Sequence, residues 1–355
     1  MNTNNVKLIK KLFDGNKMLR TEWRTLLTAL TADEKEHLRS LAATVAEERF
    51  AKGVYIRGLI EISSYCRNNC FYCGLRAANR EAQRYRLTKE DILECCAQGT
   101  AMGFNTFVLQ GGEDAVQNDE WLADVVRAIR AHYPEKAITL SVGERRADGY
   151  RLFREAGADR YLLRHETRND EHYSLLHPSS MSASKRRECL ATLKQQGFQT
   201  GSGMMIGSPG QTVEHLIDDL QFLEELQPEM IGIGPFIPAA GTPFAQEPAG
   251  SIETTLLLIS LLRLRFPDAL IPATTALATL HPSGRTRAIL AGANVVMPNL
   301  SPRSVRSKYS IYDNKATSGC EAAEEIEKLE KELHAIGYKI NLARGDYNKK
   351  KQGHV

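Results

Sequence analysis

Along residues 1–50, hydrophobic side chains recur at helical spacing with polar side chains between them. The pattern predicts helices over residues 4–13, 21–30 and 31–50. The third helix opens with a capping box, because Glu34 follows Thr31 at the spacing at which each side chain binds the other residue's backbone amide. We expect these helices to close one end of the domain that follows.

After residue 50, short β-prone runs alternate with amphipathic helical stretches, which is typical of βαβ units and a parallel sheet. We expect strands at residues 55–63, 106–110, 138–142, 160–164, 199–206, 230–234, 270–274 and 294–297. Helices are expected at residues 88–102, 119–132, 148–156, 184–196, 212–226, 252–266 and 283–291. Eight such strands predict an α/β fold, a (β/α)8 TIM-type barrel over residues 51–300. Residues 1–50 would close the barrel and residues 301–355 would form a C-terminal helical extension packed on it; six strands or an open barrel are the alternatives.

The composition excludes several classes of protein. With 355 residues and 42% hydrophobic content, the chain is long enough to bury a large core. Lysine and arginine exceed aspartate and glutamate by only three, and the basic residues are spread out except at 349–351, so nucleic acid is not an expected partner. No apolar run approaches the roughly eighteen residues of a membrane span, and the N-terminus lacks the apolar core of a secretory signal. We therefore expect a cytoplasmic protein.

Seven cysteines stand at positions 66, 70, 73, 95, 96, 189 and 320. An odd number of thiols in a chain of this kind favours metal ligation over disulfides. Cys66, Cys70 and Cys73 lie within eight residues, on the loop that leaves the first expected strand. The cysteines at 95, 96 and 189 fall in helical patterns, which is typical of ordinary packing, whereas the pattern assigns no role to Cys320.

Three clustered thiols suit a particular kind of iron–sulfur site. Four thiolates saturate a 4Fe–4S cube, so three leave one iron free to bind the amino and carboxylate groups of S-adenosylmethionine (SAM). An electron from the cluster then splits a carbon–sulfur bond to give methionine and a 5′-deoxyadenosyl radical. Tyr72 suits a wall for the adenine. A zinc site or incidental core cysteines are the alternatives, but no second cysteine pair or nearby Cys/His set completes a zinc site.

Other candidate residues stand at the carboxyl ends of the expected strands, where the chemistry of such barrels takes place. Residues 110–113, Gln-Gly-Gly-Glu, end the second strand, and their glycines let a ligand approach the backbone closely. Arg164 and Glu166 end the fourth strand, where they suit a carboxylate and an ammonium or ribose group. A tight turn and a structural ion pair are the respective alternatives.

The later strands end in less specific segments. Residues 201–212 form a glycine-rich loop without the Lys-Ser/Thr ending of a Walker motif, so we expect it to pack on adenosine rather than hold a phosphate. Residues 232–238 and 272–276 contain turn-forming glycine or proline, and the threonine hydroxyls of the second segment suit a small polar or anionic group. Arg57 lies in a run that otherwise reads as buried, so it needs an anionic partner unless it faces outward.

Segments 65–74, 159–167, 232–238, 272–276 and 292–299 closely resemble the FeFe-hydrogenase maturase HydE family, and the resemblance extends over residues 55–315. It implies a complete barrel with an internal cavity, SAM at the top and substrate below, and one 4Fe–4S cluster on Cys66, Cys70 and Cys73. The candidate SAM contacts are Tyr72, Gln110, Gly111, Gly112, Glu113, Ser141, Arg164, Glu166, Arg186, Met205 and Met297. The candidate substrate contacts are Arg57, Thr139, Met230, Pro235, Ile237, Thr274, Thr275 and Tyr312.

The resemblance also implies a reaction and partners. The family acts on an iron–carbonyl–cyanide–cysteine complex during assembly of the di-iron hydrogenase cofactor, with other maturases and an electron donor such as ferredoxin or flavodoxin. Some members hold a second cluster on a later cysteine triplet, but here the corresponding segment has the single thiol of Cys320, so we expect one cluster. A lysine mutase similar to methylornithine synthase of pyrrolysine biosynthesis, and a non-catalytic iron–sulfur scaffold, are the competing readings.

Overall fold

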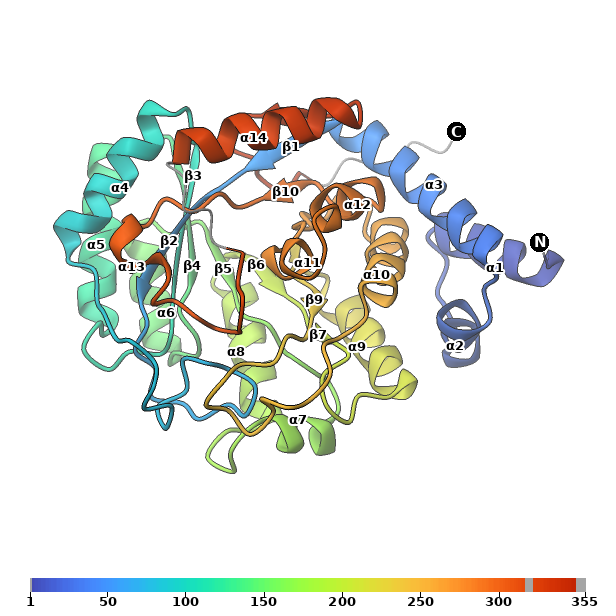
Figure 1. The fold of residues 1–355 in the computed structure, drawn as a ribbon, viewed down its shortest axis with the longest axis horizontal. Coiled ribbons are helices and arrows are strands. Elements are labelled where there is room, and N and C mark those ends of the chain that lie inside the picture. Colours follow the sequence, from blue (N-terminus) through green and yellow to red (C-terminus); the bar gives the residue numbers. More distant parts are fainter. Residues whose placement is uncertain (1, 317–321, 349–355) are drawn as a thin grey trace.

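The computed structural model describes residues 2–316 and 322–348. Three helices open the chain: α1 (Thr3–Phe13), α2 (Arg20–Thr28) and α3 (Ala32–Phe50). The predicted capping box at the start of α3 is present, since Thr31 and Glu34 bind each other's backbone amides. In Figure 1 these helices lie at one side of the barrel, where α2 packs on α9 and α3 packs on α10.

The barrel wall is built from parallel strands. They are β1 (Gly53–Ile56), β2 (Gly58–Ser63), β3 (Thr106–Gly111), β4 (Ala137–Ser141), β5 (Arg160–Leu162), β6 (Gln199–Ser202), β7 (Met205–Ile206), β8 (Met230–Ile231), β9 (Gly234–Pro235) and β10 (Val295–Val296). Six of them form one sheet in the order β2-β3-β4-β5-β6-β8. Parallel bridges from Met230 to Leu270 and from Pro272 to Val295 continue the ring, and β10 pairs with β1. Hydrogen bonds from Leu59 to Pro298 and from Leu300 to Leu59 close it.

Helices surround this wall, as Figure 1 shows. They are α4 (Lys89–Ala101), α5 (Asp119–His132), α6 (Ala147–Ala156), α7 (Asp170–Leu176), α8 (Ala183–Gln195), α9 (Val213–Leu226), α10 (Ile252–Arg265), α11 (Thr275–Leu280), α12 (Gly284–Leu290), α13 (Arg303–Arg306) and α14 (Ala322–Ala335). The α/β barrel expected from the sequence is therefore confirmed. Within the described ranges, no helix is long and apolar enough to cross a membrane.

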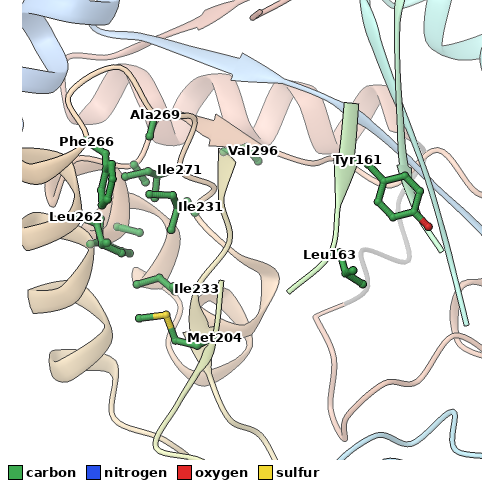
Figure 2. Close-up of a cluster of buried hydrophobic side chains, with 14 of the residues drawn as sticks. Tyr161, Leu163, Met204, Ile231, Ile233, Leu262, Phe266, Ala269, Ile271 and Val296 are labelled. Carbon is green, nitrogen blue, oxygen red and sulfur yellow. The ribbon is translucent and has the colours of Figure 1, made fainter. Parts of the chain in front are cut away.

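Part of the hydrophobic core lies between the strands and the helices outside them. Figure 2 shows Ile231 and Ile271, from neighbouring strand positions, pointing toward Leu262 and Phe266 at the end of α10. All four side chains are buried, and each contributes roughly 1.5–3 kcal/mol by leaving water. Packing of this kind fixes the barrel wall, and the wall in turn fixes where the loops at its mouth begin.

Several strands differ in extent from the expectation. The strand expected at 55–63 is divided at Arg57, where the pairing partner changes from β10 to β3. The expected strand at 199–206 is also divided, because Gly203 lies so close to Gly232 that a Cβ there would be 2.0 Å from the carbonyl oxygen of Gly232. At 270–274 the chain makes only the two bridges described above.

The C-terminal segment covers the lower end of the barrel. Its strand β11 (Lys339–Asn341), which the sequence did not predict, pairs in parallel with β1. Beyond it, Asp346 accepts a hydrogen bond from the fully buried Arg160 at 2.7 Å. The N-terminal helices pack along α9 and α10, and Phe50 of α3 packs against the apolar cluster at this end; that they close the barrel stays a prediction.

Candidate active site

The three clustered cysteines lie on the irregular loop between β2 and α4, at the mouth of the barrel. All are half-buried free thiols. Burial raises the pKa of Cys66 and Cys70 and raises the pKa of Cys73 to about 12, and the neighbouring thiols raise the pKa of Cys70 and Cys73 further. A positively charged metal centre would reverse this effect, since metal ligation requires thiolates. The donor set therefore fits a cationic group that binds all three sulfurs.

The arrangement of donors favours a cluster over a single ion. Among the residues that the structure describes, no three His, Cys, Asp or Glu side chains converge closely enough to hold one metal ion. In an iron–sulfur cube each thiolate binds a different iron, so its ligands stand farther apart than those of one zinc ion.

The cysteine loop is tied to neighbouring elements by backbone hydrogen bonds. Phe71 donates to Leu176 at the end of α7, and Gly74 donates to Ile311 of the segment that follows α13. On the β3 side the loop passes very close to Gly112, where a Cβ would lie 2.3 Å from the Tyr65 carbonyl oxygen. A glycine is thus needed at position 112 for the end of β3 to come this close to the cysteine loop.

The carboxylate of Glu113, in the same Gly-Gly-Glu turn, already has partners. Its Oε2 accepts from Arg67 Nη2 at 3.0 Å, and its Oε1 accepts from the Glu144 backbone amide at 2.8 Å. Nearby, Gln110 Nε2 lies 3.4 Å from the Tyr309 hydroxyl. The Glu113 side chain therefore connects the end of β3 to the end of β4. The groups of this turn that are available to a ligand are its backbone atoms.

Arg164 and Glu166 meet just after β5, 2.9 Å apart between Arg164 Nη2 and Glu166 Oε2. Glu166 has φ +65°, a left-handed conformation that costs energy in a residue other than glycine and is concentrated at functional sites. Arg164 Nε is buried and has no hydrogen-bond partner among the described residues. An ion pair with a spare buried donor suits a zwitterionic ligand.

Arg186 of α8 completes this charged group. Its Nε donates to Glu144 Oε1 at 2.6 Å and its Nη1 donates to the Arg164 carbonyl at 3.0 Å. Glu144, which follows β4, was not among the candidates from the sequence. The structure shows it as the counter-charge that orients Arg186.

Tyr72 forms part of an apolar wall beside the cysteines. It packs with Met205, Leu176 and Phe236, and its hydroxyl lies 3.2 Å from His177 Nε2. Burial lowers the pKa of His177 to about 3, so this imidazole is neutral at pH 7. Its Nδ1 lies 3.0 Å from the Tyr173 carbonyl and therefore carries the proton, which leaves Nε2 to accept from Tyr72.

Several buried polar atoms of the barrel wall have no hydrogen-bond partner among the described residues. Arg57 donates from Nη1 to Met230 Sδ at 3.2 Å, but its Nε and Nη2 have no partner in the described part of the chain. Burial lowers its pKa well below the usual range. The buried hydroxyls of Thr139 and Thr274 are also unpaired within residues 2–316 and 322–348. Buried donors without partners are costly unless a ligand satisfies them.

The other candidates from the sequence are Ser141, Pro235, Met297 and Thr275. Ser141 is in register with Gln110 on β3, and Pro235 is in register with Ile206. Met297 packs in the cluster that contains Met230, away from Tyr72, and with Thr275 it lines a small cavity beside the barrel mouth.

Two further substrate candidates, Ile237 and Tyr312, are both largely buried. Ile237 is buried, and the hydroxyl of Tyr312, which bonds to Thr279, has a pKa raised to about 12 by burial. Cys320 lies outside the described residues.

Sequence reasoning missed a buried ion pair at the mouth. Lys315 Nζ binds Glu61 Oε1, and Asn299 Nδ2 donates to Glu61 Oε2 at 2.9 Å. Glu61 is fully buried on the inner face of β2, and Lys315 lies on the segment that crosses the mouth after α13. The sequence did contain a signal for this pair. Glu61 is a charged residue in a hydrophobic strand, as Arg57 is, and such a residue needs a buried partner.

The fold and the site agree with comparisons to known proteins. A model of the radical SAM superfamily matches residues 60–223. The FeFe hydrogenase maturase subunit HydE of Thermotoga maritima is 45% identical over 280 residues, which cover 79% of this chain and 80% of that protein. The chain belongs to the HydE family of radical SAM enzymes. As a HydE-family enzyme it uses a 4Fe–4S cluster and SAM, which the three thiols and the Arg164–Glu166 group fit.

The HydE family shares its fold with enzymes of other activity. The 3-methylornithine synthase of Methanosarcina barkeri is 30% identical over 333 residues, covering 93% of this chain and 92% of that enzyme. A crystal structure of methylornithine synthase matches with a TM-score of 0.83 at 29% identity, over 94% of this chain and 97% of that one. The barrel is therefore common to both groups, and the residues inside it must decide the substrate.

Proposed function

We propose that this enzyme acts in assembly of the di-iron cofactor of FeFe hydrogenase, on a small iron–carbonyl–cyanide–cysteine precursor. The observation that carries the proposal is the 45% identity to HydE over most of both chains. Bound together, the cluster and SAM supply a 5′-deoxyadenosyl radical, which attacks an otherwise unreactive substrate.

The proposed cofactor residues are those at the barrel mouth. Cys66, Cys70 and Cys73 hold the cluster. Arg164 and Glu166 bind the charged groups of SAM, and Arg186 is held beside them by Glu144. The adenine packs on the apolar wall of Tyr72 and Met205.

The proposed substrate residues lie deeper in the barrel. Arg57, Thr139 and Thr274 direct buried, unpaired donors into the interior. A cation and hydroxyls that are buried from water favour an anionic substrate rich in acceptor atoms, and a cyanide- and carboxylate-bearing complex meets that description.

The proposed partners follow from this chemistry. The cluster needs a one-electron donor such as ferredoxin or flavodoxin, and the precursor must come from another maturase. We propose a cytoplasmic location because the six described cysteines are free thiols and thiolate-bound iron requires a reducing compartment. The near balance of basic and acidic residues, 46 against 43, favours neither nucleic acid nor an anionic membrane surface as a partner.

The cofactor proposal is tested by reconstituting the protein anaerobically with iron and sulfide, then adding SAM and dithionite. We expect 5′-deoxyadenosine to accumulate. An intact cluster that gives no cleavage would leave a non-catalytic scaffold as the remaining reading.

The substrate proposal needs a second comparison, because the extensive match to methylornithine synthase favours lysine as a competing substrate. We expect no methylornithine from lysine, and we expect the iron–cysteine precursor to be consumed. Methylornithine formation would overturn hydrogenase maturation in favour of pyrrolysine biosynthesis.

A further inference from the structure

The loop that carries the cysteines has almost no regular structure of its own. It runs from Ser64 to Leu87 without a helix, and apart from single turns it has only a few backbone hydrogen bonds, such as Ser64 to Tyr85 at its two ends and Ala77 to Asn68. Backbone carbonyls in such a loop still need donors where they are turned away from water. Some donor from outside the turns must therefore satisfy them.

The Arg84 guanidinium supplies that donor. Its Nη1 donates to the carbonyl of Ser64 and, at 2.9 Å, to that of Leu75. Its Nη2 donates to the carbonyls of Arg76 at 2.8 Å and Asn79 at 3.2 Å. One half-buried side chain thus binds four loop carbonyls.

The positions of these carbonyls give the contact its meaning. Ser64 stands just before Cys66, whereas Leu75, Arg76 and Asn79 follow Cys73. Arg84 therefore joins the two flanks of the cysteine segment across the base of the loop. A guanidinium is suited to this because its planar fork directs several donors at fixed angles, while an ammonium concentrates its donors at one atom.

A second residue reinforces the same base. Asn79 Nδ2 donates to the Gly74 carbonyl at 2.8 Å and to the Ala240 carbonyl at 3.2 Å. It fixes the second flank to the loop that follows β9. Arg84 therefore binds the first flank to a segment that has a further anchor. These contacts restrain the two flanks, and through them the positions of Cys66 and Cys73.

We propose that Arg84 is the positioning residue of the cluster site, which holds the two flanks of the cysteine loop at the spacing that the cluster requires. Arg84 acts through the backbone, since all four of the hydrogen bonds described above go to main-chain carbonyls. The inference rests on the proposed assignment of the three cysteines as ligands.

The first test uses the full-length protein before reconstitution, with hydrogen–deuterium exchange as the readout. In Arg84→Lys we expect amides of residues 64–79 to exchange about tenfold faster or more, because a single ammonium cannot bridge both flanks. Arg80→Gln is the matched control, since Arg80 is exposed on the same loop. Unchanged exchange in Arg84→Lys would overturn the proposal.

The second test measures the site itself, as iron bound per chain and the midpoint potential of the cluster. We expect Arg84→Gln to retain severalfold less iron than Arg80→Gln at equal thermal stability, and its residual cluster to have a more negative potential because a nearby positive charge is gone. Normal iron content and potential in Arg84→Gln would overturn the proposal. If Cys70→Ser also retains full iron, the ligand assignment itself is wrong, which separates the two failures.

Discussion

His165 and Asp219 form a buried contact, with 3.3 Å between His165 Nε2 and Asp219 Oδ1, in the segment that connects Arg164 to Glu166. The same Asp219 oxygen accepts from the Arg168 backbone amide at 2.5 Å, and His165 Nδ1 lies 2.9 Å from the Ser202 hydroxyl. A carboxylate on α9 therefore holds both ends of the turn in which Glu166 adopts its left-handed conformation.

Replacing Asp219→Asn should weaken that turn. An amide in place of the carboxylate turns one acceptor atom into a donor, which leaves a buried hydrogen-bonding group of the turn unsatisfied at a cost of about 1–3 kcal/mol. Urea unfolding should show this loss, and calorimetric titration should show weaker SAM binding. The neighbouring Asp218→Asn is the control, because Asp218 forms a surface pair with Arg20 that contributes at most about 1 kcal/mol. Equal effects of the two variants would contradict the role of Asp219.

Replacing Cys70→Ser should abolish the cluster. A serine hydroxyl is a poor iron ligand, so we expect bound iron and SAM cleavage to fall by more than about tenfold. Iron analysis and the visible absorption of the reconstituted protein measure the loss. Cys95→Ala is the control, because Cys95 is buried on α4 and not on the cysteine loop. Retention of the cluster in Cys70→Ser would refute the ligand set.

The buried His177 should make stability depend on pH. Its folded pKa of about 3 lies below the unfolded value, so its contribution is complete above about pH 6.5 and declines as the pH falls toward 3. By pH 5 the loss from this group amounts to about 2 kcal/mol. Comparing the free energy of unfolding of wild type and His177→Gln at pH 7 and pH 5 isolates the effect, since other titrating groups are shared. Parallel losses in both proteins would show that His177 titrates normally.

The Lys315–Glu61 pair should stabilise the segment that crosses the barrel mouth. In Lys315→Met the Glu61 carboxylate stays buried with Asn299 as its hydrogen-bond donor, and we expect the free energy of unfolding to drop by about 3 kcal/mol. The double variant Lys315→Met with Glu61→Leu should recover most of the loss, because no buried charge remains. A double variant that is no more stable than Lys315→Met would argue against an electrostatic origin.

The barrel could be predicted from sequence because most of its strands and helices differ in hydrophobic period. Where tertiary pairing decides, periodicity failed. The division at Arg57 depends on a change of partner strand. The strand β11 has only three residues, none of them buried, so it shows no alternation of hydrophobic and polar side chains. The helix α7 was also missed, since its seven residues give less than two helical turns of pattern.

The candidate site divides in the same way. The cysteines were found because their ligand spacing is local in sequence, whereas Glu144, His177 and Arg84 acquire their roles from contacts between elements. Nothing in the residues around Glu144 indicates that Arg186 will lie 2.6 Å away, because the two residues come from different βα units. Resemblance to a family supplies such partners only where the family's own motif includes them.

The strand β11 gives the chain an unusual order of completion during synthesis. Residues 53–55 of β1 pair with residues 339–341, which are synthesised almost three hundred residues later. The strand on the other side of β1, β10, is also synthesised long after β1. Pairing over so long a sequence separation slows folding. The ribosome must therefore reach residue 341 before the first strand has both neighbours, and until then an unpaired strand edge needs protection from aggregation.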